Sequence, residues 1–492
     1  MKFTIFLIYF EAPLKFIGVI YKFNKNIQFL YYFLGGYKIN FYIYCEFKSK
    51  TMRKIILSVI LITILVLSVF SIYLFPETTV LGAHVVPLKL DTGDTAWMLV
   101  ATGLVLLMTP GLGFFYGGMV GKKNVISTVL QSFMAMVIVT VVWVLVGFGL
   151  CFGPSVEGII GDPTSNLFFN GVSANSAWEL APTIPFILFA LFQAKFAIIT
   201  PALITGAFAE RVRFWAYLLF MVLFIVFVYS PLCHMTWHPD GLLFGWGVLD
   251  FAGGTVVHMS AGWAALAGAI FLGKRKVQKA NPARITYVLL GTGLLWFGWF
   301  GFNAGSAVGA NGLAAQALGT TTVAAAAAAM GWVFLDKLLG HKPSAMGACI
   351  GAVVGLVAIT PAAGFVTIPS ALAIGLIASV ISNLVVSKFP KGKVDDALDV
   401  FACHGVGGMV GMLLTGVFAS KSVNAIVGDN QGLIYGDPTL FLIQLKALVL
   451  VSVFAFVVSY FLFYVVNKIT PLRVSEDKEE LGLDISQHGE HL

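Results

Sequence analysis

Charged side chains are scarce in this 492-residue chain. Asp, Glu, Lys and Arg together make up 11% of it, whereas hydrophobic residues make up 59%. A soluble domain usually carries about 25% charged residues to cover its surface. The composition therefore excludes a set of ordinary soluble domains. It also excludes a disordered chain, which has few hydrophobic residues and a high net charge.

Cysteine is sparse as well. The five cysteines are scattered and form no Cys-x-x-Cys pair: Cys45, Cys151, Cys233, Cys349 and Cys403. This spacing predicts neither a disulfide framework nor a zinc site, and no cofactor is expected. The net charge of +7 would suggest nucleic-acid binding in a soluble chain. In a chain this hydrophobic, the positive-inside rule explains it better, and no nucleic-acid partner is predicted.

Long hydrophobic runs are abundant. From Asp91 onward, eleven of them are close to the length that crosses a bilayer as a helix. The sequence therefore predicts an all-α polytopic membrane protein with eleven transmembrane helices. The predicted spans are residues 94–119, 124–152, 185–208, 212–233, 254–273, 284–304, 313–336, 344–360, 367–387, 402–419 and 439–466.

The N-terminal region differs from the rest. Residues 1–51 are rich in aromatics and lysine, and they are interpreted as an upstream extension outside the fold. Met52-Arg53-Lys54 then precedes an apolar run to Phe75, which is typical of a translation start and a signal sequence. Residues 52–83 are thus predicted to be a leader or an extra transmembrane helix. Residues 91–470 form the membrane domain, and 471–492 a polar tail.

The distribution of basic residues predicts the orientation. Seventeen Lys and Arg residues follow the odd-numbered spans, against only Lys89 and Lys421 on the other side. Because basic loops stay in the cytoplasm, the first span enters from outside and the C-terminus is cytoplasmic.

Two spans resemble each other. LDFAGGTVVHMSAG begins at Leu249, and LDVFACHGVGGMVG begins at Leu398. Each has Leu-Asp, then Phe, His and small residues. Repeats of five helices must have opposite topology, so the chain is predicted to be a five-plus-five inverted repeat plus a C-terminal helix.

Ionisable residues inside the predicted spans are candidates for function. His258 and His404 occupy matching places, and the repeat symmetry would bring them together. Asp250 and Asp399 precede them and are also candidate helix caps. A metal on the two histidines would need a third ligand, which the sequence does not offer, so no metal site is predicted.

Aromatic residues gather near the outer ends of the spans. A membrane-interface belt explains such residues, but together they would also form a cation–π cup above a hydrophobic constriction. Ser306 would add a hydroxyl acceptor, which suits a small monovalent cation. Lys195 lies within a span and has no evident partner. The aromatic candidates are Phe192, Phe196, Trp237, Trp299, Phe300 and Phe302.

Several long motifs in order resemble the Amt/Mep ammonium transporters. The similarity runs from about Asp91 to the end, including the tail LGLDISQHGEHL, and leaves the first ninety residues uncovered. The motifs are DTAWMLVATGLVLLMTPGLGFFYGGMV, AFAERVRFWAYLLF, LDFAGGTVVH, GLLWFGWFGFNAGSA, ITPAAGF and FACHGVGGMVG.

The resemblance implies a homotrimer in the cell membrane, with one conduction path for ammonium or ammonia in each subunit. It also implies a cytoplasmic tail that regulates transport and a PII-type nitrogen signal protein that binds on that side. By motif, the resemblance assigns Phe196, Trp237 and Ser306 to an external ammonium site, with Asp250 behind it. It assigns Phe196 and Phe302 to a gate below that site. It assigns His258, His404 and Trp299 to the pore. The chain departs from several relatives at Lys195 and at His238-Pro239-Asp240.

Three alternatives remain at this point. The related Rh glycoproteins share the histidine pair, but Trp237 and the tail favour Amt. An ammonium receptor would usually carry a fused signalling domain. An intramembrane hydrolase would need a nucleophile motif or a metal set, so the protein is not expected to be an enzyme.

Overall fold

The computed structural model describes residues 6–10, 16–23, 26–31, 58–69, 84–277, 281–388 and 394–492. The chain divides into two compact units, Met1–Val69 and Phe70–Leu492. Much of the predicted upstream extension, and residues 52–57 and 70–83 of the predicted leader, lie outside the described residues.

The first unit contains a small antiparallel sheet that sequence analysis did not predict. Its strands are β1 (Phe6–Phe10), β2 (Phe16–Phe23) and β3 (Asn26–Tyr31), in the order β1-β2-β3. Aromatic and β-branched residues, which favour strands, dominate these segments. The unit also contains a short apolar helix, Ser58–Val69, within the predicted leader.

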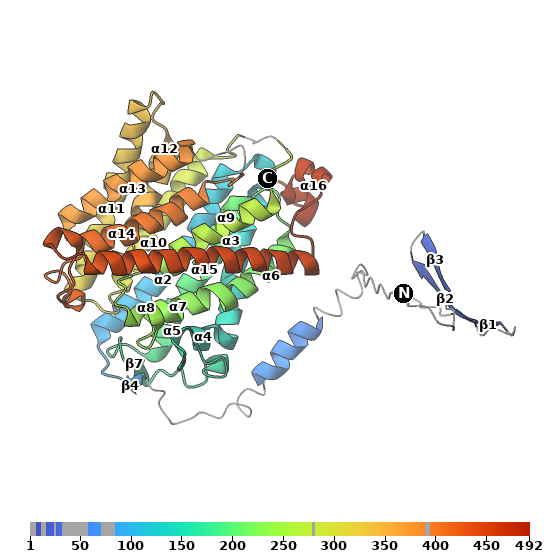
Figure 1. Ribbon diagram of the computed structural model, residues 1–492, viewed down its shortest axis with the longest axis horizontal. Coiled ribbons are helices and arrows are strands. Elements are labelled where there is room, and N and C mark those ends of the chain that lie inside the picture. Colours follow the sequence, from blue (N-terminus) through green and yellow to red (C-terminus); the bar gives the residue numbers. More distant parts are fainter. Residues whose placement is uncertain are drawn as a thin grey trace. The chain divides into compact units, whose positions relative to one another are not determined.

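The second unit is helical (Figure 1). Five long helices each contain a π-helical or 3₁₀ segment. Two of them have such a segment in the middle: α3 (Val125–Val142), η2 (Trp143–Gly147) and α4 (Phe148–Phe152) form one, and α6 (Phe214–Phe224), η5 (Ile225–Tyr229) and α7 (Ser230–Trp237) form the other. The other three have it at one end: α5 (Phe186–Ile204) ends in η4 (Thr205–Phe208), α9 (Ser260–Leu272) begins with η6 (Gly254–Met259), and α14 (Gly407–Phe418) begins with η7 (Phe401–Val406). The remaining helices are α2 (Thr92–Met119), α8 (Leu242–Gly245), α10 (Ile285–Gly305), α11 (Gly312–Leu338), α12 (Ala345–Ile359), α13 (Ile368–Lys388), α15 (Thr439–Ile469) and α16 (Glu476–Leu481).

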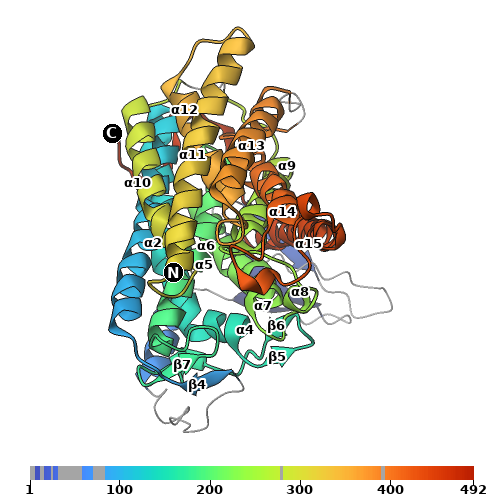
Figure 2. The same cartoon turned by 90° about the vertical axis from the view of Figure 1, so that its left-hand side faces the viewer.

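Ten of the predicted spans are helices long and apolar enough to cross a membrane, among the residues that the structure describes. The eighth, predicted at 344–360, is the 15-residue helix α12. At 1.5 Å per residue it measures about 22 Å, less than the roughly 30 Å of a bilayer core. It packs against α11 and α13 (Figure 2) and is largely buried. The predicted count of eleven full-length spans is therefore only partly matched.

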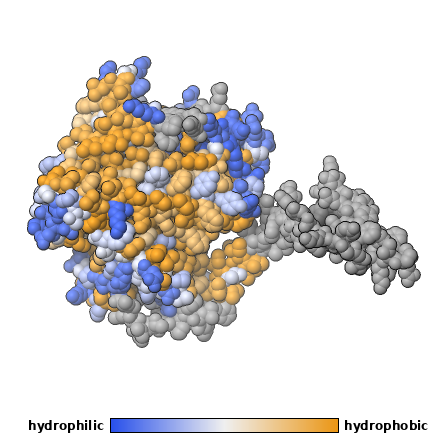
Figure 3. All heavy atoms as spheres, in the orientation of Figure 1, coloured by the Kyte–Doolittle hydropathy of each residue, from blue (hydrophilic) through white to orange (hydrophobic). Residues whose placement is uncertain are grey.

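Hydrophobic side chains cover the middle of the face that α15 crosses, and hydrophilic residues gather toward its two ends (Figure 3). Along α15, Val449, Val453 and Val457 are each more than half exposed. Their spacing of four residues places them on one side of the helix. Such an apolar outer stripe is what a lipid-facing helix requires.

Short strands connect the helices at one end of this unit. β4 (Val85–Pro87) pairs antiparallel with β7 (Ser176–Trp178), and β5 (Ser155–Val156) pairs with β6 (Ile160–Gly161). The first pair joins the segment before α2 to the segment before α5.

Two interrupted helices cross at very close range in the centre of the unit. A Cβ atom added to Gly262 of α9 would lie 2.1 Å from the backbone nitrogen of Gly405 in η7. Only glycine permits this approach of two backbones. The crossing sets the distance between η6 and η7, which begin these two helices.

The polar tail is folded against the helices. Asp484 accepts hydrogen bonds from the backbone N–H groups of Ile126 and Ser127, in the first turn of α3, at 3.1 and 2.7 Å. A carboxylate is favourable there because the N–H groups of a first turn have no helical partner. Nearby, the Leu483 N–H donates to Asn124 Oδ1 at 2.8 Å.

Ion pairs join three connections between helices, and a separate ion pair lies within the tail. Arg275 donates to Glu210 at 2.8 Å and to Asp395 at 2.6 Å, while Arg473 donates to Glu479 at 2.7 Å. Burial raises the pKa of Asp395, but the hydrogen bonds from Arg275 outweigh it and bring the pKa to about 2. This carboxylate therefore stays ionised, and keeps its partner, throughout the physiological pH range.

We expect Gly262→Ala to destabilise the protein, because its methyl group would overlap the Gly405 backbone. Overpacking of this kind typically costs about 1–3 kcal/mol. Gly293→Ala is the matched control, since a Cβ there would meet nothing within 4 Å. Thermal unfolding of the two purified variants in detergent measures the difference. Equal midpoints would show that the crossing tolerates a side chain.

We expect Asp484→Ala to loosen the tail, because it leaves the N–H groups of Ile126 and Ser127 without their carboxylate. The loss should be about 1–2 kcal/mol, as for a helix cap. Limited proteolysis of the tail measures this as faster cleavage within residues 475–492. Glu490→Ala, which removes an exposed tail carboxylate, is the control. The same cleavage rate in both variants would contradict the docking role of Asp484.

Candidate functional site

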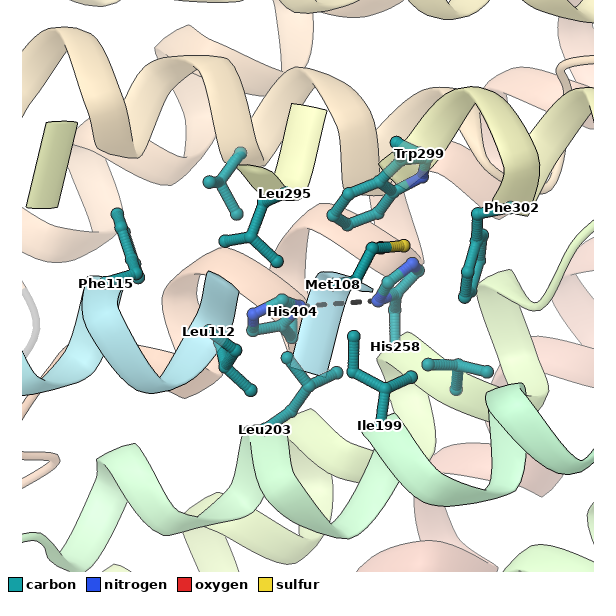
Figure 4. Close-up of a pocket in the computed structure, with 12 residues that line it drawn as sticks. Met108, Leu112, Phe115, Ile199, Leu203, His258, Leu295, Trp299, Phe302 and His404 are labelled. Atoms are coloured by element: carbon teal, nitrogen blue, oxygen red, sulfur yellow. Dashed lines mark hydrogen bonds between the residues drawn. The ribbon is translucent and has the colours of Figure 1, made fainter. Parts of the chain in front are cut away.

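His258 and His404 meet in the interior, as the repeat predicts. Their Nδ1 atoms lie 3.3 Å apart, and their rings are nearly parallel with centroids 5.4 Å apart. His258 comes from η6 and His404 from η7, and the side chains are 1% and 3% exposed. Figure 4 shows the two rings side by side, joined by this contact.

The contact between the two rings determines which ring nitrogens are donors and which are acceptors. A hydrogen bond between two Nδ1 atoms needs one donor and one acceptor, so the Nδ1 nitrogens of two neutral rings share one proton. The Nε2 atom of one ring is then an acceptor, and the Nε2 atom of the other carries a proton. The Nε2 atom of His258 is buried and has no partner in the described part of the chain. It is available to a small polar molecule.

The cavity beside the pair is otherwise apolar. In Figure 4, Phe302 and Trp299 lie beyond His258, and Leu112 and Phe115 lie beyond His404. The Trp299 indole N–H does not point into free space, because it donates to Thr360 Oγ1 at 2.9 Å. The other lining side chains are those of Met108, Ile199, Leu203, Val257, Leu295 and Val353.

Two phenyl rings close the cavity on the His258 side. The rings of Phe196, from α5, and Phe302, from α10, have centroids 4.2 Å apart. Phe302 lies 5.9 Å from the His258 ring, and Trp299 stacks on that ring at 5.3 Å. Phe196, Phe302 and Trp299 are at most 2% exposed. The predicted gate and pore residues thus form one continuous aromatic column.

Trp237 and Ser306 lie at the end of this column that is farther from the histidines. Trp237, at the end of α7, contacts the Phe196 ring edge-on at 5.8 Å and is partly exposed. Ser306 follows α10, and its hydroxyl donates to the Phe302 carbonyl at 2.8 Å. Because that proton is already used, the serine oxygen is left as an acceptor. It suits a ligand that donates hydrogen bonds.

Asp250 acts as a helix cap. Its carboxylate accepts from the N–H groups of Gly253, Gly254 and Thr255 at 2.7–2.8 Å, and also from the Thr255 hydroxyl. Its backbone carbonyl accepts from the Trp237 indole at 3.0 Å. Asp250 therefore orients both η6 and Trp237, and its carboxylate has no free direction toward a substrate.

At η7, the carboxylate in the position that Asp250 holds at η6 is that of Asp396 and not that of Asp399. The N–H groups of Val400 and Phe401 donate to the Asp396 carboxylate at 3.1 and 2.7 Å. Asp399 instead takes a left-handed backbone conformation, with φ of 56°. By sequence, Leu249-Asp250 matches Leu398-Asp399 because the residue pairs are identical. That alignment is three residues away from the one that the structure shows, in which Asp250 matches Asp396. Equal spacing to the histidine would have identified Asp396, which precedes His404 by the same eight residues that separate Asp250 from His258.

Three further predicted residues lie around this column. Phe192 contacts Phe196 at 5.0 Å. Phe300 contacts Phe297, whose side chain is 54% exposed, so it lies on the outer face and not in the column. Lys195 is partly exposed, and within the described residues no hydrogen bond or ion pair is found for it. Thr360, which orients Trp299, was missed because a lone threonine carries no sequence signal.

Known proteins match most of this chain. A family model described as "Ammonium Transporter Family" matches residues 96–492. The chain is 46% identical over 428 residues to an ammonium transporter of Aquifex aeolicus, covering 87% of this chain and 97% of that protein. It is 47% identical over 403 residues to an ammonium transporter of Bacillus subtilis, covering 82% and 98%.

Solved structures are similar too. The crystal structure of Saccharomyces cerevisiae Mep2 has a TM-score of 0.74 at 36% identity, covering 81% of this chain and 91% of that one. A protein described as "Sensor Amt Protein" has a TM-score of 0.73 at 31% identity, covering 80% and 98%. Together with the apolar helices and the buried histidine pair, these matches show that the chain belongs to the ammonium transporter family: it is a multi-pass membrane transporter of ammonium, not an enzyme.

Proposed function

We propose that the protein binds the ammonium cation at an outer aromatic cup, removes its proton, and passes ammonia through the cavity lined by His258 and His404. The observation that carries this proposal is the histidine pair itself. It places one unpaired Nε2 nitrogen in a cavity that is otherwise apolar. Such a site can bind a small neutral molecule that both donates and accepts hydrogen bonds.

The cup in this proposal consists of Trp237, Phe196 and Ser306. Aromatic faces attract a cation through their quadrupole, and the serine oxygen accepts one N–H. Potassium has no proton to donate. It is therefore attracted to the aromatic faces but cannot form the directional hydrogen bond to the serine oxygen. Asp250 contributes by holding Trp237 and by its charge, without touching the ion.

Dehydration is the reason for the proton loss. Between the cup and the histidines, the rings of Phe196 and Phe302 are in contact, with centroids 4.2 Å apart. An unpaired charge in such surroundings is very costly, whereas neutral ammonia is not. Neutral imidazoles carry no negative charge to offset that cost. The cation therefore leaves its proton at the outer side, and the uncharged base continues.

Below the gate, the Nε2 atoms of His258 and His404 provide one hydrogen-bond donor and one acceptor. Ammonia can use both, so it replaces the hydrogen bonds it would otherwise make to water. Each such bond is weak, which allows the molecule to leave again.

The proposed architecture is an inverted repeat of five plus five helices followed by a C-terminal helix, eleven in all, N-out and C-in, in the cell membrane. The support comes from the two halves of the site. In both halves a carboxylate caps a π-turn eight residues before a pore histidine. We further propose that Met52 is the translation start, that 52–83 is a leader or an additional transmembrane helix, and that 91–470 is the transporter domain.

The proposed assembly is a homotrimer in the lipid bilayer, regulated by a PII-type protein at its cytoplasmic face. The tail, 471–492, is the proposed regulatory surface. Its contacts support this role, because Asp484 holds the start of α3 and Glu479 accepts from the N–H of Lys276 in the connection after α9. A partner that displaced the tail would free both connections at once.

We expect Trp237→Leu to lower the apparent affinity for ammonium and to weaken discrimination against potassium. A desolvated cation–π contact is worth about 2 kcal/mol, which corresponds to roughly thirtyfold in affinity. Uptake of labelled methylammonium by reconstituted vesicles, with potassium as competitor, measures both. Trp246→Leu is the matched control, because the Lys446 ammonium already covers that ring at 3.4 Å. Indistinguishable uptake by the two variants would exclude the cup.

We expect His258→Ala with His404→Ala to lose most selective transport, by roughly tenfold or more, since about 1.5 kcal/mol disappears with each hydrogen bond. In contrast, His258→Asp with His404→Glu places negative charge in the pore. That variant should conduct ammonium as the ion and leak potassium. Currents and methylammonium uptake in vesicles separate the two outcomes. If both variants transport at the wild-type rate and exclude potassium, the histidines are not the conducting element.

A further inference from the structure

A second cluster of ligand-type side chains lies apart from the pore, around the turn that follows α7. It consists of His84, just before β4, and of His238 and Asp240, just after Trp237. One potential ligand atom from each of the three residues lies within 4.8 Å of the other two. Residues more than 150 positions apart thus converge on one point. Nothing in the transport mechanism uses them.

The contacts around His84 bring negative charge to both of its nitrogens. Its Nε2 atom lies 2.8 Å from Asp240 Oδ2, and its Nδ1 atom lies 2.9 Å from Glu179 Oε1. The second contact is not aligned as a hydrogen bond. Glu179 directly follows β7, the strand that pairs with β4. The carboxylate of Asp240 thus lies at one edge of the His84 ring and that of Glu179 at the other.

His238 supplies the observation that points to a ligand. Its side chain is fully buried, and its Nε2 atom has no partner among the described residues. Its Nδ1 atom accepts from the Asp240 backbone N–H at 3.1 Å. The ring is held between neighbours, with His84 edge-on at 4.8 Å and His234 stacked at 4.3 Å. A buried, unpaired imidazole nitrogen beside another histidine is unfavourable unless something binds it.

The cluster is open to solvent on one side. The Asp240 side chain is 57% exposed and that of Glu179 is 34% exposed, while that of His84 is 15% exposed. A cation can therefore enter past the carboxylates and reach the imidazoles behind them. Two carboxylates would balance the charge of a divalent ion.

We propose that His84, His238 and Asp240 form a three-ligand binding site for a first-row divalent transition metal such as Zn²⁺, with Glu179 holding His84 from the side of its Nδ1 atom. Mixed imidazole and carboxylate ligands favour this class, whereas Ca²⁺ and Mg²⁺ prefer oxygen alone. Zinc ligands lie about 2.0–2.2 Å from the metal. The donor atoms that are farthest apart must approach by roughly 1.5 Å, which side-chain rotation can provide.

The bound metal is a clamp between two segments. His84 belongs to the segment that enters β4, and His238 with Asp240 to the turn after α7. When Nε2 of His238 binds the metal, its proton moves to Nδ1 and the contact with the Asp240 N–H is lost. The metal thus shifts and then fixes the turn that directly follows Trp237. The clamp is separate from the proposed ammonium path.

The test is metal binding by the full-length protein purified without a histidine tag. Titration calorimetry with ZnCl₂ should give one zinc ion per chain, and zinc should raise the melting temperature by several degrees, since it binds only the folded state. MgCl₂ should do neither. His84→Ala and Asp240→Asn should each weaken zinc binding at least tenfold and abolish the shift in melting temperature.

Two variants serve as controls. His341→Ala removes an exposed histidine, and Asp429→Asn removes a carboxylate that is 99% exposed; both should bind zinc like the wild type. Asp240→Asn keeps the test decisive if His84→Ala does not fold, because Asp240 lies at the surface. If the wild type binds no zinc, or if Asp240→Asn binds it as tightly as the wild type, the cluster is only an ion pair of His84 with two carboxylates and the proposal is wrong.

Discussion

The arrangement of the pore depends on how closely two broken helices cross. The methylene of Gly262 faces the backbone of Gly405, and a side chain at Gly262 would force the helices apart. That separation determines whether His258 and His404 can touch. Their contact of 3.3 Å is near the outer limit of a hydrogen bond, so a shift of a few tenths of an ångström would break it. Each ring would then lose the partner that fixes its tautomer. The small residues around both histidines are therefore part of the site, although none of them carries a functional group.

Two separate sets of hydrogen bonds position the aromatic column. Asp250 caps η6, which carries His258, and its carbonyl holds the Trp237 indole. Thr360 holds the Trp299 indole, so neither tryptophan N–H is free to bind a passing molecule. The rings present π-faces and the serine presents an oxygen. A site built in this way attracts a cation weakly and offers no strong ligand that would retain it.

The sequence predicted the elements of this site better than their geometry. Apolar runs located the spans because a helix in a bilayer must be apolar over its whole length. Matching motifs located His258, His404 and Phe302. The sequence did not reveal that α12 is only 15 residues long, that both histidines lie on π-turns, or that Asp396 is the second cap. These features depend on backbone hydrogen bonds that residue type does not determine. The cluster of His84 with His238 was equally hidden, since no sequence pattern links the segment before β4 to the turn after α7.

The position of Asp250 explains how a buried carboxylate can help a cation without trapping it. A free carboxylate beside an ion in a low-dielectric region would bind it by many kcal/mol, and conduction would stop. Here four donors from residues 253–255 already occupy both oxygens, so the charge is largely balanced within its own turn. The remaining field is weak. In the proposed mechanism this weak field adds to the attraction between the cation and the π-faces of the cup. The total attraction stays small because the field is weak. Because the attraction ends where the cup ends, nothing in the apolar cavity below favours the charged form over ammonia.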